Sequence, residues 1–109
     1  MGYKVFLAKL SDEVRIRHNE IESNQNGIDL RFNDASPNLV IWDNVIEFGD
    51  NSTNKYSGIN VDGANLSQPG ASRITFNTIN YRAGATSAFN GIKLQGASYF
   101  QVSKCTLNM

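Results

Sequence analysis

A six-residue pattern recurs four times along the chain, and its second copy reads Ile41-Trp42-Asp43-Asn44-Val45-Ile46. An apolar residue begins and ends the pattern, and Asn occupies its fourth position. The other copies are Ile16-Arg17-His18-Asn19-Glu20-Ile21, Ile74-Thr75-Phe76-Asn77-Thr78-Ile79 and Val102-Ser103-Lys104-Cys105-Thr106-Leu107, in which Cys replaces Asn. Successive Asn residues lie 25 and then 33 positions apart, so the pattern keeps its spacing while the linkers change length. Such variation is typical of a repeated coil with loop insertions.

A second repeated pattern precedes three of these copies. It reads Gly27-Ile28-Asp29-Leu30, Gly58-Ile59-Asn60-Val61 and Gly91-Ile92-Lys93-Leu94. In both patterns apolar residues alternate with polar or variable ones, which indicates short, half-buried strands. Gly, Asn, Asp, Ser and Pro gather between the strands, where turns are expected. Because no segment of helix length has an apolar stripe with helical period, we predict an all-β chain.

The composition limits the class of protein. The chain has 109 residues, a formal net charge of zero, 14 Asn, nine Gly and one Cys. This length suits one domain, and one Cys excludes an internal disulfide and a multi-Cys metal site. A neutral chain without a Lys/Arg run lacks the basic patch typical of nucleic-acid-binding proteins. No apolar run has the length of a membrane span, and the N-terminal residues have no signal-peptide pattern.

The two patterns together resemble the repeats of the right-handed parallel β-helix found in the pectin-lyase-like superfamily. The resemblance covers almost the whole chain and implies a solenoid of about four coils, each with three strands. In that family a ladder of stacked Asn side chains occupies the tight corner between the second and third strands, which implies this role for Asn19, Asn44 and Asn77. Coils stack about 4.8 Å apart. We therefore expect each Asn to turn the corner in the left-handed backbone region and to bond the adjacent coils.

The coils also predict which side chains stack inside. The inward column of the second strand is Ile16, Ile41, Ile74 and Val102. The inward column of the third strand is Ile21, Ile46, Ile79 and Leu107. On the first strand we expect the column Val5, Ile28, Ile59 and Ile92. A one-residue slip would exchange the inward and outward faces, so a wrong register would disrupt several aliphatic columns together.

The chain is interpreted as one β-helix domain, residues 1–109. It begins at a first strand and ends at a third strand, and neither end has an obvious cap such as an amphipathic helix. Exposed end strands pair readily with other chains, and solenoids normally cover them. Two interpretations follow. The chain is a fragment of a longer β-helix, or it is a unit with further coils or other copies packed on its open ends.

In the pectin-lyase-like family, sugars usually lie along the outer face of the first strands. The resemblance therefore implies three candidate catalytic residues, Asp29, Asp62 and Lys93, and two candidate ligand-binding residues, Asn60 and Arg31. The two carboxylates are diagonal neighbours about 8 Å apart, a separation that can flank a glycosidic bond.

The hydrolase elements of the family, paired Asp with Gly-His and Arg-x-Lys, are absent. We therefore expect no complete catalytic site in this chain alone. An active relative would be a polysaccharide lyase, a glycoside hydrolase or an epimerase. No metal site is predicted from the residues, and calcium enters only as a cofactor that the resemblance implies.

Aromatic residues are further candidates, because a flat ring can stack on a sugar. Trp42 projects outward from the second strand, and Tyr56 lies in the longest insertion, residues 48–57. That loop and the loop of residues 82–90 are the expected binding loops. The alternative is that long loops fold back and these rings cover the coil. His18 lies at the tight corner, where we expect a structural or neutral role.

Two functions from different classes follow. The first is a carbohydrate-directed β-helix module, as in polysaccharide-processing enzymes or phage tailspikes, with a glycan partner and an extracellular or virion-associated location. The second is a non-catalytic structural unit that self-assembles end to end into an oligomer or filament. Neither function predicts a nucleic-acid or membrane partner.

Overall fold

The computed structural model describes residues 3–7, 13–32, 38–49, 55–62, 72–82, 89–95 and 100–108. Within these residues every regular element is a β-strand and none is a helix, which confirms the predicted all-β class. The strands are β1 (Tyr3–Leu7), β2 (Glu13–Arg17), β3 (Glu20–Glu22), β4 (Ile28–Phe32), β5 (Asn38–Trp42), β6 (Val45–Phe48), β7 (Tyr56–Asp62), β8 (Ser72–Thr75), β9 (Thr78–Tyr81), β10 (Phe89–Gln95), β11 (Phe100–Ser103) and β12 (Thr106–Asn108).

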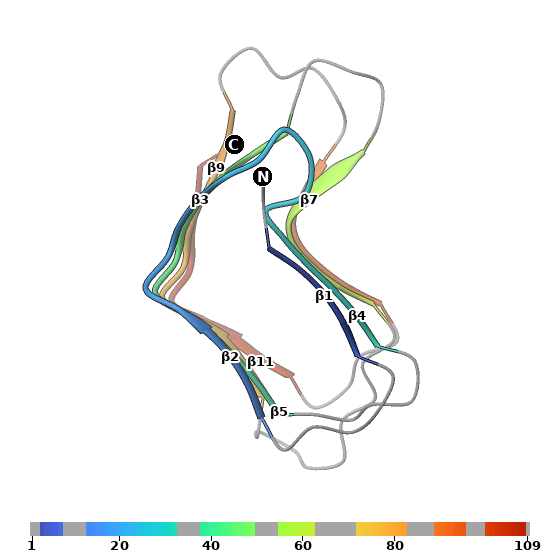
Figure 1. The fold of residues 1–109 in the computed structure, drawn as a ribbon. Helices are drawn as coiled ribbons and strands as arrows, with labels where there is room; N and C mark the ends of the chain where they lie inside the picture. Colours follow the sequence, from blue (N-terminus) through green and yellow to red (C-terminus); the bar gives the residue numbers. More distant parts are fainter. Residues whose placement is uncertain are drawn as a thin grey trace.

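The strands form three parallel sheets, and every third strand along the chain belongs to the same sheet. The first sheet has the order β1-β4-β7-β10, the second β2-β5-β8-β11 and the third β3-β6-β9-β12. Figure 1 looks along the stack, where the strands of each sheet lie behind one another. We call three consecutive strands, one in each sheet, a level; adjacent levels lie about 4.8 Å apart. This arrangement is compatible with a parallel β-helix.

The core lies between the three sheets and is almost entirely aliphatic. On the second sheet Ile41 pairs with Ile16 and Ile74, and Val102 pairs with Ile74. The third sheet aligns Ile21, Ile46, Ile79 and Leu107 in the same way. These pairings are the columns predicted from the sequence. Ile41 has an exposed fraction of 1%, so the middle of the stack excludes water.

The register of β1 differs from the prediction. Tyr3 lies opposite Ile28 and Val5 lies opposite Leu30, whereas the sequence placed Val5 opposite Ile28. The difference is two residues, which leaves the alternation of inward and outward positions unchanged. The Gly-Ile pattern that marks the other first-sheet strands is absent from β1, so the hydrophobic alternation alone did not specify its register.

The glycine of the Gly-Ile pattern is required by close packing. A Cβ atom on Gly58 would lie 2.4 Å from Cγ2 of Ile79 and 2.7 Å from the carbonyl oxygen of Gly91. A Cβ atom on Gly27 would lie 2.3 Å from Cγ2 of Ile46. Only hydrogen fits in this space, so the pattern marks the place where the first sheet approaches both the third sheet and the next level.

The corner between the second and third sheets is turned by the residue that precedes each Asn. His18, Asp43, Phe76 and Lys104 have φ values of 57, 57, 56 and 54°. The repeat pattern predicts that the Asn itself takes this left-handed region. That detail was wrong. The side chain of the left-handed residue points outward into solvent, and the amide of the following Asn points into the stack.

The corner Asn side chains are joined from level to level by hydrogen bonds. Asn19 donates from Nδ2 to Oδ1 of Asn44 at 3.0 Å, and Asn44 donates from Nδ2 to Oδ1 of Asn77 at 2.9 Å. Asn44 and Asn77 are each 1% exposed. In the last level, Cys105 takes this position with its Sγ 3.9 Å from Nδ2 of Asn77. A longer, weaker contact with sulfur thus replaces the amide bond there.

Candidate functional site

The outer face of the first sheet carries the candidates that were selected from the sequence. Asp29 lies opposite Asn60, and Arg31 lies opposite Asp62. Lys93 lies opposite Asn60 on the next strand. The five residues therefore occupy two adjacent rows across β4, β7 and β10, and Asp29 and Asp62 are diagonal neighbours.

Asp29 is the most engaged of these side chains. Its Oδ1 accepts hydrogen bonds from Nδ2 of Asn60 at 2.9 Å and from Nε of Arg31 at 3.3 Å. Burial raises the pKa of this carboxyl group, but hydrogen bonds from Asn60 and Arg31 and the charge of Arg31 outweigh it, so the pKa is lowered below 3.8. A glycosidase acid needs a raised pKa, so Asp29 has the wrong shift for a general acid.

Tyr56 lies elsewhere. It is the first residue of β7 rather than a loop residue, and its partly buried ring packs against the core. Phe89 likewise begins β10, opposite Tyr56. Most of the two predicted binding loops, residues 50–54 and 83–88, lies outside the described residues. The structure therefore does not bring Tyr56 to the same face as Trp42, which lies on the second sheet.

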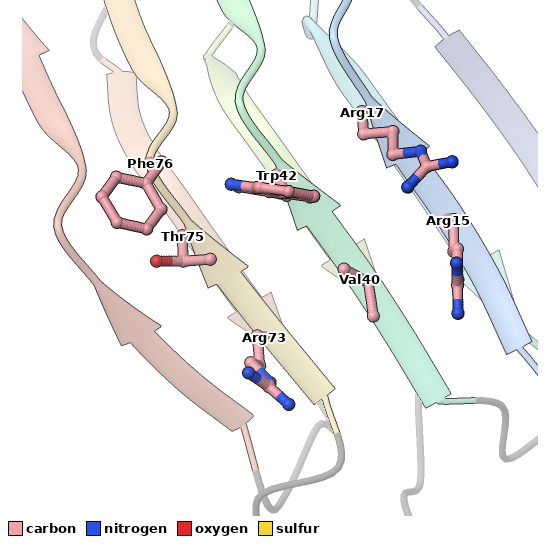
Figure 2. Close-up of a pocket in the computed structure, with 7 residues that line it drawn as sticks. All are labelled: Arg15, Arg17, Val40, Trp42, Arg73, Thr75 and Phe76. Carbon is pink, nitrogen blue, oxygen red and sulfur yellow. The ribbon is translucent and has the colours of Figure 1, made fainter.

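A groove crosses the outer face of the second sheet (Figure 2). Its lining residues are Arg15 and Arg17 on β2, Val40 and Trp42 on β5, Arg73 and Thr75 on β8, and Phe76 at the following corner. Strand pairing aligns them in two rows, Arg15–Val40–Arg73 and Arg17–Trp42–Thr75. The groove has a volume of about 400 Å³, which lies within the usual range for small-molecule sites. We call it the Trp42 groove.

Two aromatic rings are exposed along one edge of the Trp42 groove. Trp42 is 37% exposed and Phe76 is 49% exposed. The ring of His18 lies 5.2 Å from that of Trp42, centroid to centroid, and Nδ1 of His18 lies 2.7 Å from Oδ2 of Asp43. Nζ of Lys104 lies 5.2 Å from the centre of the Phe76 ring. The corner residues His18 and Lys104 thus each contact one of the two rings.

Positive charge gathers in the same groove. Arg15 and Arg17 point to the same face of one strand, about 6.6 Å apart at Cα, and Arg73 lies two strands from Arg15 at about 10 Å. Within the ranges that the structure describes, neither Arg17 nor Arg73 forms an ion pair. In contrast, two arginines outside the groove form ion pairs: Nε of Arg31 lies 3.3 Å from Oδ1 of Asp29, and Nε of Arg82 lies 3.6 Å from Oε1 of Glu47. The groove is therefore a local cationic site on a chain with zero formal net charge.

The three groove arginines were missed in the sequence analysis, which selected only Trp42 on this face. The signal was present in the repeat, because the residues on either side of each inward second-strand residue point outward. These outward positions are 15 and 17 on β2, 40 and 42 on β5, and 73 and 75 on β8. Three of these six positions are Arg, and one is Trp.

Three further findings concern metals, membranes and relatives. Among the described residues, no three His, Cys, Asp or Glu side chains gather as a metal site would require. The described part of the chain contains no helix that is long and apolar enough to cross a membrane. Comparisons with protein-family models, curated proteins and solved structures found no match for this chain. Function is therefore inferred from the side chains themselves.

Proposed function

We propose that this chain is a right-handed parallel β-helix module of the pectin-lyase-like type that binds carbohydrate. Three parallel sheets that take every third strand support the β-helix. The right-handed path is supported by the strong preference of parallel crossover connections for that hand. The proposal includes a glycan partner and an extracellular or virion-associated location.

The observation that carries the proposal is the exposed ring of Trp42 between polar side chains in a groove. A sugar ring has an apolar C–H face and a rim of hydroxyl groups. The indole of Trp42 offers a broad apolar surface on which the C–H face can stack. Arg17 and Thr75 flank Trp42 on the neighbouring strands and supply hydrogen-bond donors for the hydroxyl groups of the sugar. Because all three side chains project from paired strands, their spacing is set before a ligand arrives.

Replacing Trp42 by Ala is expected to weaken saccharide binding by about tenfold or more, since buried aromatic anchors carry much of the binding free energy. Isothermal titration with a panel of neutral and acidic oligosaccharides measures this effect. Trp42→Phe keeps a ring and is expected to retain part of the affinity. Val45→Ala removes an exposed apolar side chain from the third sheet and serves as the matched control with unchanged affinity.

Two results would count against a carbohydrate-binding function. One is a folded wild-type chain that binds no saccharide in the panel. The other is a Trp42→Ala variant that binds the same saccharide as tightly as wild type, which would place binding outside the Trp42 groove.

A second candidate function is end-to-end self-assembly, and the last level favours it. Leu94, Val102 and Leu107 are 37, 45 and 49% exposed, whereas their partners in the preceding level, Val61, Ile74 and Ile79, are 0% exposed. The outer edges of β10, β11 and β12 also carry backbone groups that a further parallel level can pair. A second copy, joined through its own β1–β3 edge, would extend all three sheets.

Sedimentation velocity over a range of protein concentrations tests this second candidate. Stacking copies are expected to give larger species as concentration rises. A Leu107→Glu variant is expected to shift the distribution toward monomer, because a charge would enter the apolar contact. A wild-type chain that stays monomeric at high concentration would exclude end-to-end assembly.

A further inference from the structure

We infer that the Trp42 groove selects a glycan that carries oxyanion groups, either carboxylate or sulfate, held by Arg15, Arg17 and Arg73. The inference rests on the proposed carbohydrate-binding function and specifies its ligand. Three arginine side chains and one indole ring lie on a single face of the second sheet, as Figure 2 shows.

The positions of the arginines suit charged substituents on a ring stacked at Trp42. Arg17 is the direct neighbour of Trp42 on β2, and Arg73, which is paired with Val40, is its diagonal neighbour on β8. Each guanidinium presents a planar set of donors that fits two oxygens of one oxyanion. Cationic donors therefore lie on both sides of the stacked ring.

The spacing of the arginines favours an extended ligand with more than one charge. Arg15 and Arg73 lie in one row with Val40 between them, about 10 Å apart at Cα. Two charged groups on a glycan that crosses the strands can meet one arginine each, with an apolar segment over Val40.

The absence of ion pairs at two of these arginines separates charged from neutral sugars. Arg31 and Arg82 each have a carboxylate partner, Asp29 and Glu47 respectively. Arg17 and Arg73 have none within the described residues. Like charges on one face repel each other, and a neutral sugar would leave that repulsion in place. An oxyanionic glycan removes it and gains charge-assisted hydrogen bonds.

The charges around the groove favour a glycan over single-stranded nucleic acid, which could also stack on Trp42 and contact arginines. Nucleic acid carries a phosphate at every nucleotide, and its binding depends on an extended positive field. This chain has zero formal net charge. In addition, the carboxylate of Asp43, 56% exposed, lies at the corner directly after Trp42. A strand with a phosphate at every nucleotide would bring one of its charges to Asp43, whereas the oxyanions of a glycan can lie at the Arg15 and Arg73 end of the groove.

Isothermal titration with length-matched probes tests the inference. The probes are an oligouronate, a sulfated oligosaccharide, a neutral oligosaccharide and oligo-dT. At least one charged saccharide is expected to bind tenfold or more tightly than the neutral one. Arg17→Gln and Arg73→Gln are each expected to weaken that binding by about tenfold. Lys55→Gln removes the same unit charge from an exposed residue away from the groove and is expected to change nothing.

The possible outcomes distinguish the inferred selection for charged glycans from the proposed carbohydrate binding itself. Tighter binding of the sulfated or of the uronate probe identifies the oxyanion, and either supports the inference. Equal binding of neutral and charged saccharides, unaffected by Arg17→Gln and Arg73→Gln, would overturn the charge selection and leave carbohydrate binding intact. Binding of no saccharide would overturn both. Tighter binding of oligo-dT than of any saccharide would assign the groove to nucleic acid instead.

Discussion

Replacing Ile41 by Asp is expected to unfold the chain. Ile41 is 1% exposed and stacks between Ile16 and Ile74 in the second-sheet column. Loss of a buried aliphatic side chain costs about 2–5 kcal/mol, and burial of a carboxylate without a partner adds several kcal/mol more. A small domain is stable by only about 5–15 kcal/mol in total. Circular dichroism and urea denaturation should show no cooperative transition for this variant.

A matched substitution separates burial from the introduction of charge. Val45→Asp places the same carboxylate on β6 at a position that is 45% exposed, where solvent hydrates it. We expect this variant to stay folded and to melt cooperatively at a temperature only slightly below that of wild type, because Glu20 lies opposite residue 45 and adds a small like-charge repulsion. If Ile41→Asp also melted cooperatively near the wild-type temperature, the inward column of the second sheet would be wrong.

Replacing Asn44 by Ala is expected to lower the free energy of unfolding by about 3 kcal/mol, because buried partners lose their hydrogen bonds. Oδ1 of Asn44 accepts from the backbone N–H and from Nδ2 of Asn19, and Nδ2 of Asn44 donates to the carbonyl oxygen of Ile16 at 3.0 Å and to Oδ1 of Asn77. Urea titration followed by circular dichroism measures the change. The loss at half-buried Asn19 should be smaller.

The reciprocal change is expected in the last level. Cys105→Asn supplies an amide oxygen for Nδ2 of Asn77, which now lies 3.9 Å from sulfur, and an amide donor for the carbonyl oxygen of Ile74, 3.7 Å from Sγ. We expect a gain of about 1 kcal/mol, the usual net value of a hydrogen bond. An Asn44→Ala variant as stable as wild type would show that the corner amides do not hold the levels together.

The alternation of apolar residues was enough to predict the sheets and most of their registers. Ile41, Ile46 and their column partners recur at fixed spacing around an Asn, so a wrong alignment would have placed polar residues in the core. The register of β1 was wrong by two residues because a two-residue slip preserves that alternation. The left-handed corner residue was misplaced because Asn favours positive φ, whereas Phe76 and Lys104 are not residue types that do.

The candidate site was only partly predictable. Trp42 was recognised because an apolar ring at an outward position is conspicuous in a strand. Arg15 and Arg17 precede Arg73 by 58 and 56 residues along the chain, and only the pairing of β2, β5 and β8 brings them to one face. On the first sheet, Asp29 and Arg31 had the expected positions, but the hydrogen bonds that hold Asp29 ionised depend on side-chain geometry that no spacing pattern contains.

Trp42 is the only Trp in the chain, so its fluorescence reports directly on the Trp42 groove. The most direct test is therefore a fluorescence titration of the wild-type chain with the uronate and sulfated oligosaccharides. We predict a saturable change in Trp42 emission with at least one charged saccharide. The affinity is expected to be lower for the neutral saccharide, and lower for the charged one in the Arg73→Gln variant. A folded chain whose emission stays constant with every saccharide would contradict glycan binding at this face.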